Sequence, residues 1–391
     1  MSGLVLISTA EFTLKSQPVR RLLVRLLKRH IRFNLKRIGL DDCVIKPAGG
    51  LLIVGLFGDA EAAAKILARI PGVAHADACE RTSPALEEIV ERTTRLAQQK
   101  MNQGETFAVR ARNFEPSNLK TKEIEIRAGA EILSRLSGRV KVNLDNPDRT
   151  LRVFFGARDA FVSDARFTGP GGLPVGSQGK LMGLATDSVR SPLAFYLMMK
   201  RGAMVWPVIP NLRPLLGETQ PEAVLQGLEA LAPIVPRKGY SAYLIDPDED
   251  AAKVLDAVDQ SLRRIFSIRL ALRAIACLPG NRGTLGLVTG DLFGHAGLET
   301  LRDLRLVDEV AKFPVYRPLL TLDEDNVNRQ LGELGLPRLM GRETAGRVSP
   351  AGLSDASATN LRDLEERVEA EEIAQRIAAN ARKIPIQMPG S

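Results

Sequence analysis

The spacing of apolar and polar positions over the first part of the chain predicts two small α+β units. Residues 1–76 show a β-α-β-β-α order followed by one more strand, which is typical of a ferredoxin-like unit. Residues 77–175 again mix helical and strand-like segments and close on a Pro/Gly linker at residues 170–174. The predicted strands are 4–7, 44–47, 51–56, 73–76, 106–112, 140–143, 151–155 and 161–167. The predicted helices are a basic helix starting near Pro18, then 60–70, 83–99 and 121–136.

Residues 176–346 alternate strand-like and helix-like segments, which predicts a doubly wound parallel α/β domain. Ligands of such sheets bind at the carboxyl ends of the strands, near helix N-termini. We expect residues 347–391 to form a charged tail with one helix over 361–384 that packs on the surface. The predicted strands are 180–185, 204–209, 241–245, 285–288 and 315–318. The predicted helices are 192–201, 221–231, 251–258, 260–276, 298–304 and 324–334.

The first predicted helix concentrates positive charge. No acidic residue occurs between Thr13 and Leu40, and Pro18 suits a first helical turn. Helical periodicity predicts a buried face of Val19, Leu22, Leu23, Leu26, His30 and Phe33. The opposite face would carry a cationic ridge about 20 Å long, the span of several phosphates. Its members are Arg21, Arg25, Lys28, Arg29, Arg32 and Lys36, with Lys15 just before the helix.

Composition favours an anionic partner and excludes several classes of protein. The chain of 391 residues has a formal net charge of +8 and 45% hydrophobic residues, as in a globular protein with an acidic ligand. Three separated cysteines and three histidines argue against a disulfide framework or a zinc site. Residues 1–9 are apolar but lack a cleavage site, and no run is long enough to span a membrane. We therefore expect a cytoplasmic protein without a bound metal.

Several motifs in the same order along the chain resemble the tRNA 4-thiouridine synthetase family, also called tRNA sulfurtransferases and linked to thiamine biosynthesis. The resemblance covers most of residues 5–335. The matching segments begin with Glu-Phe-Thr-Leu-Lys-Ser-Gln-Pro-Val-Arg at residues 11–20 and Phe-Ala-Val-Arg-Ala-Arg at residues 107–112. They continue with Asn-Pro-Asp at 146–148, Gly-Gly-Leu-Pro-Val-Gly-Ser-Gln at 171–178, Leu-Val-Thr-Gly-Asp at 287–291 and Pro-Val-Tyr-Arg-Pro-Leu-Leu at 314–320.

The resemblance implies a division of labour between the domains. The ferredoxin-like unit and a THUMP RNA-binding domain grip tRNA, with Arg110, Arg112 and Lys120 as candidate contacts on the THUMP part. A PP-loop α/β domain uses ATP with Mg²⁺ to adenylate a uridine oxygen before sulfur is transferred. Family members often form homodimers, so the resemblance also implies a homodimer as one possible state.

The pyrophosphate loop departs from the family pattern Ser-Gly-Gly-x-Asp-Ser. In that pattern the glycines let backbone N–H groups close around pyrophosphate at a helix N-terminus. Residues 186–191 read Thr-Asp-Ser-Val-Arg-Ser, so Thr186 and Ser191 keep hydroxyls while Asp187 brings a carboxylate. A carboxylate near a polyphosphate is repulsive by a few kcal/mol, about two decades of affinity or more. A register shifted by three residues, with Asp187 and Ser188 closing the motif, remains an alternative.

Other positions of the nucleotide cleft are partly kept, and each has a structural interpretation beside the ligand role. The candidate cleft residues are Leu184, Ala185, Thr186, Ser191, Trp206, Arg269, Gly290 and Glu299. The family's sulfur-carrying cysteine is replaced in residues 341–346, where Thr344 or Ala345 stands, and no cysteine follows Cys277. We expect Cys277 itself to be a packed thiol.

Three functions remain open. The sequence favours a tRNA-binding paralogue with reduced or lost catalysis and therefore no assigned catalytic residue. The second is an active ATP-dependent tRNA uridine sulfurtransferase that takes sulfur from an external donor. The third is another THUMP-linked modification such as methylation, which the missing Asn-Pro-Pro-aromatic motif disfavours.

Overall fold

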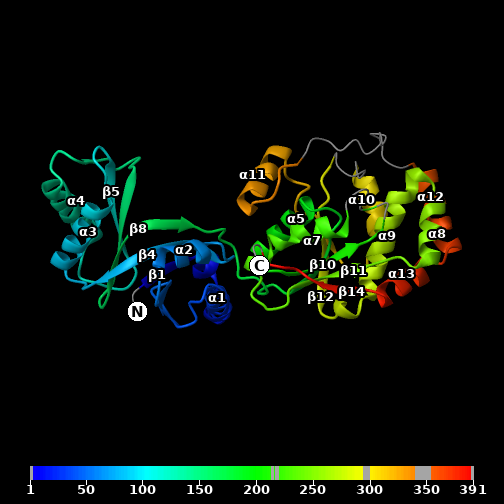
Figure 1. Cartoon of the computed structure of the whole chain (residues 1–391), viewed down its shortest axis with the longest axis horizontal. Coiled ribbons are helices and arrows are strands. Elements are labelled where there is room, and N and C mark those ends of the chain that lie inside the picture. The colour runs from blue at the N-terminus through cyan, green and yellow to red at the C-terminus, as the bar shows by residue number, and fades with distance from the viewer. Residues whose placement is uncertain (1–2, 213–214, 216–219, 294–299, 340–353, 389–391) are drawn as a thin grey trace. The chain divides into compact units, whose positions relative to one another are not determined.

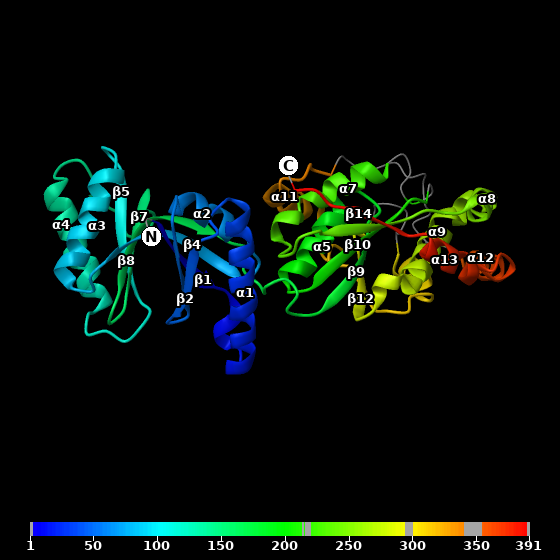
Figure 2. The ribbon, with the colours of Figure 1, turned by 60° about the horizontal axis from the view of Figure 1, so that its bottom comes forward.

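The computed structural model describes residues 3–212, 215, 220–293, 300–339 and 354–388. The chain divides into an N-terminal unit, Met1–Pro174, and a C-terminal unit, Val175–Ser391. Each unit has its own β-sheet and its own hydrophobic clusters. Figures 1 and 2 show the two units, coloured from blue at the N-terminus to red at the C-terminus.

The N-terminal unit is built on one eight-stranded sheet in the order β2-β3-β1-β4-β8-β7-β5-β6. Its strands are β1 (Gly3–Thr9), β2 (Cys43–Ala48), β3 (Leu51–Leu56), β4 (Val73–Thr82), β5 (Thr106–Asn113), β6 (Lys141–Val142), β7 (Arg149–Phe155) and β8 (Ala160–Thr168). Its helices are η1 (Glu11–Leu14), α1 (Gln17–Arg37), α2 (Ala60–Ala68), α3 (Leu86–Lys100) and α4 (Thr121–Arg135). The predicted strands and helices of this region are therefore present.

Strand β4 joins what the sequence suggested were two separate units. It continues to Thr82, through the predicted boundary at residues 76/77, and pairs with β1 on one side and β8 on the other. Because both of its edges are hydrogen-bonded, the sheet runs without interruption from β2 to β6. The division into a ferredoxin-like domain at residues 1–76 and a THUMP domain at residues 77–175 remains a prediction.

The four α-helices of the N-terminal unit pack on one face of this sheet. Helices α1 and α2 cover Val5, Ile7 and Val54. Helices α3 and α4, which lie side by side in Figure 1, cover Val109, Val153 and other side chains on the same face of the sheet. On the opposite face, Leu6, Phe154 and Phe161 form a smaller cluster with Leu51, Cys79 and Phe114. No described helix contributes to that cluster, and we call this side the open face.

The buried stripe of α1 is rotated from the predicted one. Val19 and Leu22 are 42% and 46% exposed, so their assignment to the core is wrong. The buried residues are Leu23, Leu27, His30, Ile31, Asn34 and Leu35. The helix contains two overlapping leucine-rich stripes, and packing against α2 and the sheet selects the one that begins at Leu23.

The C-terminal unit is a six-stranded sheet in the order β13-β12-β9-β10-β11-β14. Neighbouring strands from β13 to β11 are parallel, and β14 is the one antiparallel strand among the described residues of this sheet, which agrees with the predicted doubly wound α/β class. The strands are β9 (Lys180–Leu184), β10 (Met204–Pro210), β11 (Ser241–Ile245), β12 (Thr284–Thr289), β13 (Val315–Tyr316) and β14 (Arg382–Pro385). The helices are α5 (Arg190–Lys200), α7 (Pro221–Glu229), α8 (Glu249–Ala257), α9 (Gln260–Cys277), α10 (Leu301–Asp308), α11 (Glu324–Leu334), α12 (Asp355–Arg367) and α13 (Ala370–Ala379), with short 3₁₀ turns at Ala232–Ile234 and Pro279–Asn281.

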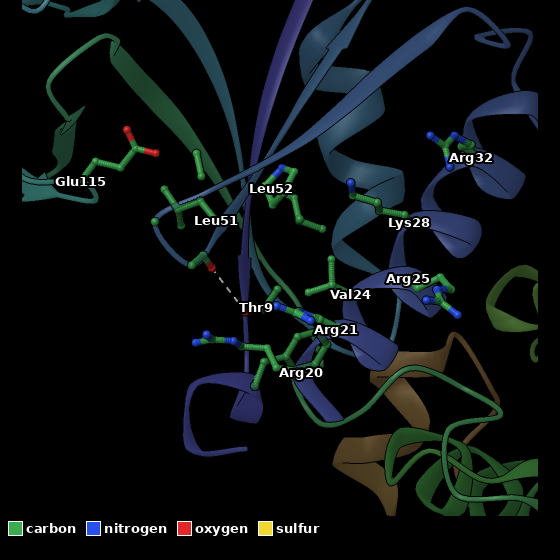
Figure 3. Close-up of a pocket in the computed structure, with 15 residues that line it drawn as sticks. Thr9, Arg20, Arg21, Val24, Arg25, Lys28, Arg32, Leu51, Leu52 and Glu115 are labelled. Carbon is green, nitrogen blue, oxygen red and sulfur yellow. Dashed lines mark hydrogen bonds between the residues drawn. The ribbon is translucent and has the colours of Figure 1, made fainter. Parts of the chain in front are cut away.

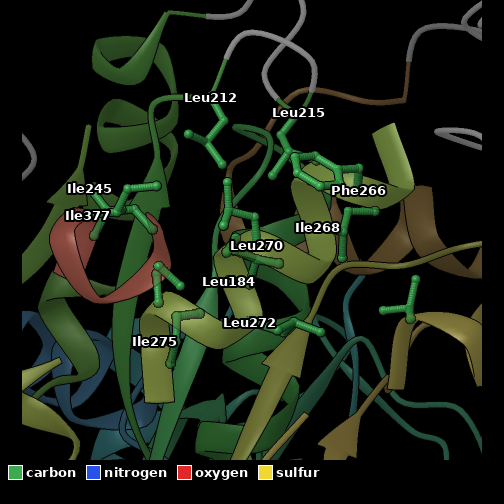
Figure 4. Packing of buried hydrophobic residues seen from close by; sticks show 14 of the residues in the cluster. Leu184, Leu212, Leu215, Ile245, Phe266, Ile268, Leu270, Leu272, Ile275 and Ile377 are labelled. Carbon is green, nitrogen blue, oxygen red and sulfur yellow. The ribbon is translucent and has the colours of Figure 1, made fainter. Parts of the chain in front are cut away.

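Helices cover both faces of this sheet. One layer contains α5, α7 and α11, packed on Leu181, Val205 and Val288. The other contains α8, α9, α10, α12 and α13, packed on Met182, Leu184 and other residues of the opposite alternation. Figure 4 shows this second layer, where Phe266 and Ile275 of α9 and Ile377 of α13 meet the sheet residues Leu184 and Ile245.

The C-terminal tail is not the single helix predicted over residues 361–384. Glu369 adopts a left-handed conformation with φ 54°, which ends α12 and starts α13 in a new direction. After α13 the chain forms β14, which pairs with the edge strand β11. The tail is thus part of the domain, and its Leu361, Ile373 and Ile377 are buried in the core.

Candidate functional site

A cationic groove of about 790 Å³ lies between α1 and the β2–β3 hairpin. Figure 3 shows Arg21, Arg25 and Lys28 on α1 on one side and Leu51 and Leu52 of β3 on the other. The α1 positions recur every three or four residues, so they share one side of the helix. The cations that line this α1 groove are Arg20, Arg21, Arg25, Lys28 and Arg32.

The charge of the α1 groove has no internal counterpart. Within the described residues, none of its five α1 cations forms an ion pair, and Glu115 is the single carboxylate in the lining. Phe12, Val24 and Leu52 give the groove an apolar floor. Such a surface suits a polyanion that also has apolar faces, as a nucleic acid does.

Three predicted contacts near α1 lie outside the groove lining. Lys15 precedes the helix and Arg29 is exposed on it. Lys36 is exposed near the C-terminal end of α1, where its Nζ lies 3.9 Å from Asp41. These three cations extend the positive surface but do not meet the other candidates in one hollow.

A second cationic hollow, of about 350 Å³, lies on the open face of the N-terminal unit. It contains the predicted Arg110 and Arg112 of β5, and also Arg152 of β7 and Arg166 of β8, which sequence reasoning missed. We call these four residues the guanidinium pocket. The alternation of residues 150, 152 and 154 could have indicated Arg152. Lys120, the residue before α4, is exposed and does not line this pocket.

The loop at residues 186–191 folds around the side chain of Asp187. Its Oδ1 accepts hydrogen bonds from the backbone N–H groups of Val189, Arg190 and Ser191, at 2.9, 2.5 and 3.3 Å. Its Oδ2 lies 3.3 Å from Nε of Arg190, whose side chain is 9% exposed. The carboxylate therefore occupies the anion position at the N-terminus of α5, where N–H groups and the helix dipole favour negative charge.

Neighbouring segments fix the shape of this loop. A Cβ atom at Gly227 of α7 would lie 2.1 Å from the carbonyl oxygen of Ser188. A Cβ atom at Gly290 would lie 2.9 Å from backbone atoms of Arg190 and Ser191. Gly290 follows β12 as predicted, and its missing side chain lets β12 approach the start of α5. On the inner side, Oγ of Ser191 accepts from the N–H groups of Thr186 and Asp187, at 3.1 and 3.4 Å.

Arg269, a predicted nucleotide contact, is buried in an ion-pair network. Its Nε and Nη2 donate to the two carboxylate oxygens of Glu365 on α12, at 2.7 and 2.6 Å. Its Nη1 donates to the carbonyl oxygen of Leu306 and lies 3.3 Å from Glu309. Arg273 donates to the same Glu365 at 2.9 and 2.8 Å. Burial raises the pKa of Glu365, but the bonds from both guanidinium groups outweigh it and lower that pKa.

The remaining cleft candidates are spread over β9 and β10. Leu184 and Ala185, at the carboxyl end of β9, are buried and lead directly into the 186–191 loop. The ring of Trp206 has two cationic neighbours, with Nζ of Lys180 5.8 Å and Cζ of Arg237 4.5 Å from its centroid. Lys180 is the first residue of β9, and Arg237 lies in the segment before β11, so the polar neighbours of the Trp206 ring come from outside the 186–191 loop. Glu299 and residues 341–346 lie outside the described residues.

Cys43, Cys79 and Cys277 are all free thiols, and Cys277 packs beside the core of the C-terminal unit. The described residues contain no group of three or more His, Cys, Asp or Glu side chains that could hold a metal ion. Within the same residues, no helix is both long and apolar enough to cross a membrane.

Two family models match the chain. The model for the thiamine biosynthesis protein ThiI matches residues 176–339, in the C-terminal unit. The THUMP domain model matches residues 84–164, in the N-terminal unit. The match over 176–339 includes the 186–191 loop and Arg269, and the match over 84–164 includes three arginines of the guanidinium pocket.

Relatives of known name span both units. A tRNA sulfurtransferase of Proteus mirabilis is 27% identical over 388 residues, which cover 96% of this chain and 78% of the relative. A probable tRNA sulfurtransferase of Aeropyrum pernix is 29% identical over 347 residues, 87% of this chain and 85% of the relative.

Two solved structures share the fold. The crystal structure of a 4-thiouridine synthetase–RNA complex with bound ATP superposes with a TM-score of 0.78 at 21% identity, covering 98% of this chain and 100% of that one. The structure of PH1313 from Pyrococcus horikoshii has a TM-score of 0.63 at 23% identity, covering 85% and 100%. With the matches to the ThiI and THUMP models, the chain is similar over both units to the tRNA sulfurtransferases, or 4-thiouridine synthetases.

Proposed function

We propose that this chain binds tRNA through its N-terminal unit and that its C-terminal unit has reduced or lost the ATP-dependent chemistry of the family. The observation that carries the second part is the Asp187 carboxylate at the N-terminus of α5. The α1 groove, with its unpaired cations, supports the first part.

The residues of the 186–191 loop do not fit a pyrophosphate group. Three backbone N–H groups that an anion would use already donate to Asp187. The guanidinium of Arg190 is buried against the same carboxylate rather than directed outward. A polyphosphate would have to displace a carboxylate that is covalently tethered two to four residues away and is therefore present at a high effective concentration.

Arg269 supports the same proposal from another direction. Its three nitrogen atoms are engaged by Glu365, Leu306 and Glu309. A ligand that recruited this guanidinium would leave the buried Glu365 with Arg273 as its remaining partner. Removing one partner of a buried ion pair costs several kcal/mol, so the network favours a structural role for Arg269.

Calorimetric titration with ATP and Mg²⁺ tests the loss of nucleotide binding. The wild type is compared with a loop variant that carries Thr186→Ser, Asp187→Gly, Ser188→Gly and Arg190→Asp, which restores the family pattern. We expect the variant to bind at least a hundredfold more tightly, because the competing carboxylate is gone and the backbone N–H groups are free. Tight binding by the wild type, equal to that of the variant, would contradict the proposal.

An active ATP-dependent tRNA uridine sulfurtransferase is the second candidate. It is favoured by the retained Ser191, whose hydroxyl lies at the start of α5 beside the N–H groups of Thr186 and Asp187. Its sulfur would come from an external donor. Incubation with ATP, Mg²⁺, tRNA and sulfide separates the two candidates, because this one requires release of AMP and pyrophosphate and the formation of 4-thiouridine.

Binding of tRNA is tested by a gel-shift assay at several salt concentrations. Phosphate contacts release counterions, so we expect the logarithm of the association constant to fall steeply and linearly with the logarithm of the salt concentration. No binding at low salt, or a flat salt dependence, would remove the RNA part of the proposal. Size measurement of the same sample tests the predicted homodimer.

A further inference from the structure

The guanidinium pocket on the open face is a second place where the N-terminal unit concentrates positive charge. Arg110 and Arg112 come from β5, Arg152 from β7 and Arg166 from β8, and all four line the hollow of about 350 Å³. In the parallel register, Arg110 lies directly opposite Arg152. Like charges opposite each other on neighbouring strands are destabilising, so this arrangement has a cost within the fold.

A β-bulge brings the fourth arginine to this face. Ala78 of β4 pairs with Ala165 of β8, and the next pair is Glu80 with Val162. These two pairs are two residues apart on β4 but three residues apart on β8. The extra residue reverses the alternation of β8, because successive side chains point to opposite faces of a sheet. Val162 consequently packs under the helices, whereas Arg166 lies on the open face beside Phe154.

The pocket keeps more positive than negative charge. Arg166 binds Asp77, a fully buried carboxylate, through Nε and Nη2 at 2.8 and 3.2 Å. Arg110 and Arg152 instead donate to the carbonyl oxygens of Leu144 and Thr150, which orient them without neutralising them.

Arg112 is exposed and forms no ion pair within the part of the chain that the structure describes. The four arginines of the pocket face two carboxylates, the buried Asp77 and the exposed Asp145. Two positive charges therefore remain uncompensated.

Titratable groups around the pocket respond to this excess charge. Burial, and then the charge of Arg166, lowers the pKa of Arg152. His75, whose neighbours include Arg166, Asp77, Arg152 and Arg112, has its pKa lowered first by burial and then by the charge of Arg166. An anion bound in the pocket would oppose both charge effects.

We propose that the guanidinium pocket binds a phosphodiester group of the RNA backbone, as a contact separate from the α1 groove. This inference rests on the RNA binding proposed above and assigns Arg152 and Arg166 to it in addition to Arg110 and Arg112. Guanidinium forks match phosphate oxygens in bidentate geometry, and several of them converge here. The aromatic residue in the lining, Phe154, is buried and has the Arg166 guanidinium 5.9 Å from its ring centroid. The pocket therefore favours a phosphate over a stacked base.

The first test measures tRNA affinity against salt concentration for Arg112→Gln and for Arg112→Gln with Arg152→Gln. We expect the double variant to bind about tenfold more weakly at moderate salt and its salt slope to fall by about one, the value for one lost phosphate contact. Arg127→Gln with Arg158→Gln is the matched control, because both residues are exposed and outside the hollows. Arg112 is exposed, so its single variant keeps the test informative if Arg152→Gln disturbs folding. Unchanged affinity and slope would overturn the inference.

The second test follows the pKa of His75 by NMR, with His75→Gln to assign its signal. We expect saturating tRNA to raise this pKa in the wild type but not in the double variant, because the bound phosphate offsets the arginine charges. A parallel titration with inorganic phosphate distinguishes the source of the anion. If free phosphate raises the pKa of His75 and tRNA does not, the RNA assignment is refuted. The same holds if an acidic peptide raises this pKa and tRNA does not.

The two proposals fail in different ways. If charge reversal on α1 abolishes tRNA binding and the pocket variants have no effect, the proposed function stands and this inference is wrong. If the protein does not bind tRNA at all, the proposed function is wrong, and the inference falls with it.

Discussion

Two sets of arginines, one in each unit of this protein, differ in whether a carboxylate neutralises them. In the N-terminal unit, the α1 groove and most of the guanidinium pocket present cations that no carboxylate neutralises within the described residues. In the C-terminal unit, four largely buried arginines are paired with carboxylates of the same unit. Arg190 pairs with Asp187, Arg269 and Arg273 pair with Glu365, and Arg317 pairs with Asp291 and Asp308.

The first set of arginines is available to bind an external anion, whereas the charges of the second set are already balanced by carboxylates of the protein. An unpaired guanidinium in water keeps its ability to bind phosphate, whereas a buried, paired one would have to break existing bonds first. Both kinds of arginine contribute equally to the net charge of +8. Total charge therefore says little about where an anionic partner binds.

The largest effect is expected from Glu365→Ala, which removes the shared partner of Arg269 and Arg273. Two buried cations would lose their main counter-charge, and the C-terminal unit should lose about 3–5 kcal/mol of unfolding free energy. Urea denaturation followed by the fluorescence of Trp206, the one tryptophan of the chain, measures it. Arg382→Ala, which breaks the exposed pair with Asp246, should cost about 1 kcal/mol or less. Equal losses in both variants would show that burial does not distinguish the pairs.

Asp187→Ala should destabilise the same unit by about 2 kcal/mol, because α5 loses the acceptor for its first N–H groups and Arg190 loses its partner. Asp187→Asn is the control, since an amide oxygen can still accept from those N–H groups. We expect Asp187→Asn to lose less than half as much unfolding free energy as Asp187→Ala. If Asn is as harmful as Ala, the charge rather than the hydrogen bonding holds the loop.

Reversing two charges on α1 with Arg25→Glu and Arg29→Glu should weaken tRNA binding about tenfold or more at moderate salt, as the loss of several phosphate contacts would. The change is about 1.4 kcal/mol or more in binding free energy. Arg127→Glu with Arg158→Glu carries the same change of net charge at other exposed positions. An equal loss from both pairs would mean that net charge, and not the α1 surface, governs binding.

The smallest effect concerns a carboxylate of the N-terminal unit that is paired. Glu105 accepts from the backbone N–H and then the side-chain amide of Asn102, and also from Arg149, which lowers its pKa from 4.5 to about 2. Because the folded state binds this proton more weakly than the unfolded state, the stability from Glu105 is present above pH 4.5. It is lost as the pH falls from about 4.5 towards 2. Carboxyl NMR titration should find Glu105 still ionised at pH 3, and Glu105→Gln should flatten the acid loss of stability.

Much of the fold could be predicted from the order of residues. The predicted ranges of β3, β11 and α11 agree with the structure residue for residue, because strong apolar runs or clear helix signals bound them. The tail was misjudged because Glu369 takes a left-handed conformation that a helical pattern does not reveal. The α1 core was misplaced because its sequence contains two apolar stripes, of which packing selects one.

The sequence by itself determined that residues 13–40 lack carboxylates and that Asp187 stands between the strand-like segment 180–185 and the helix-like segment 192–201. Both are properties of the amino-acid sequence, and folding does not change them. Tertiary structure alone decided which arginines are neutralised. Glu365 reaches Arg269 across 96 residues of chain, and one extra residue in β8 turns Arg166 towards Arg152. Electrostatic energy depends on distance through space and on burial, and both are set only when the chain has packed.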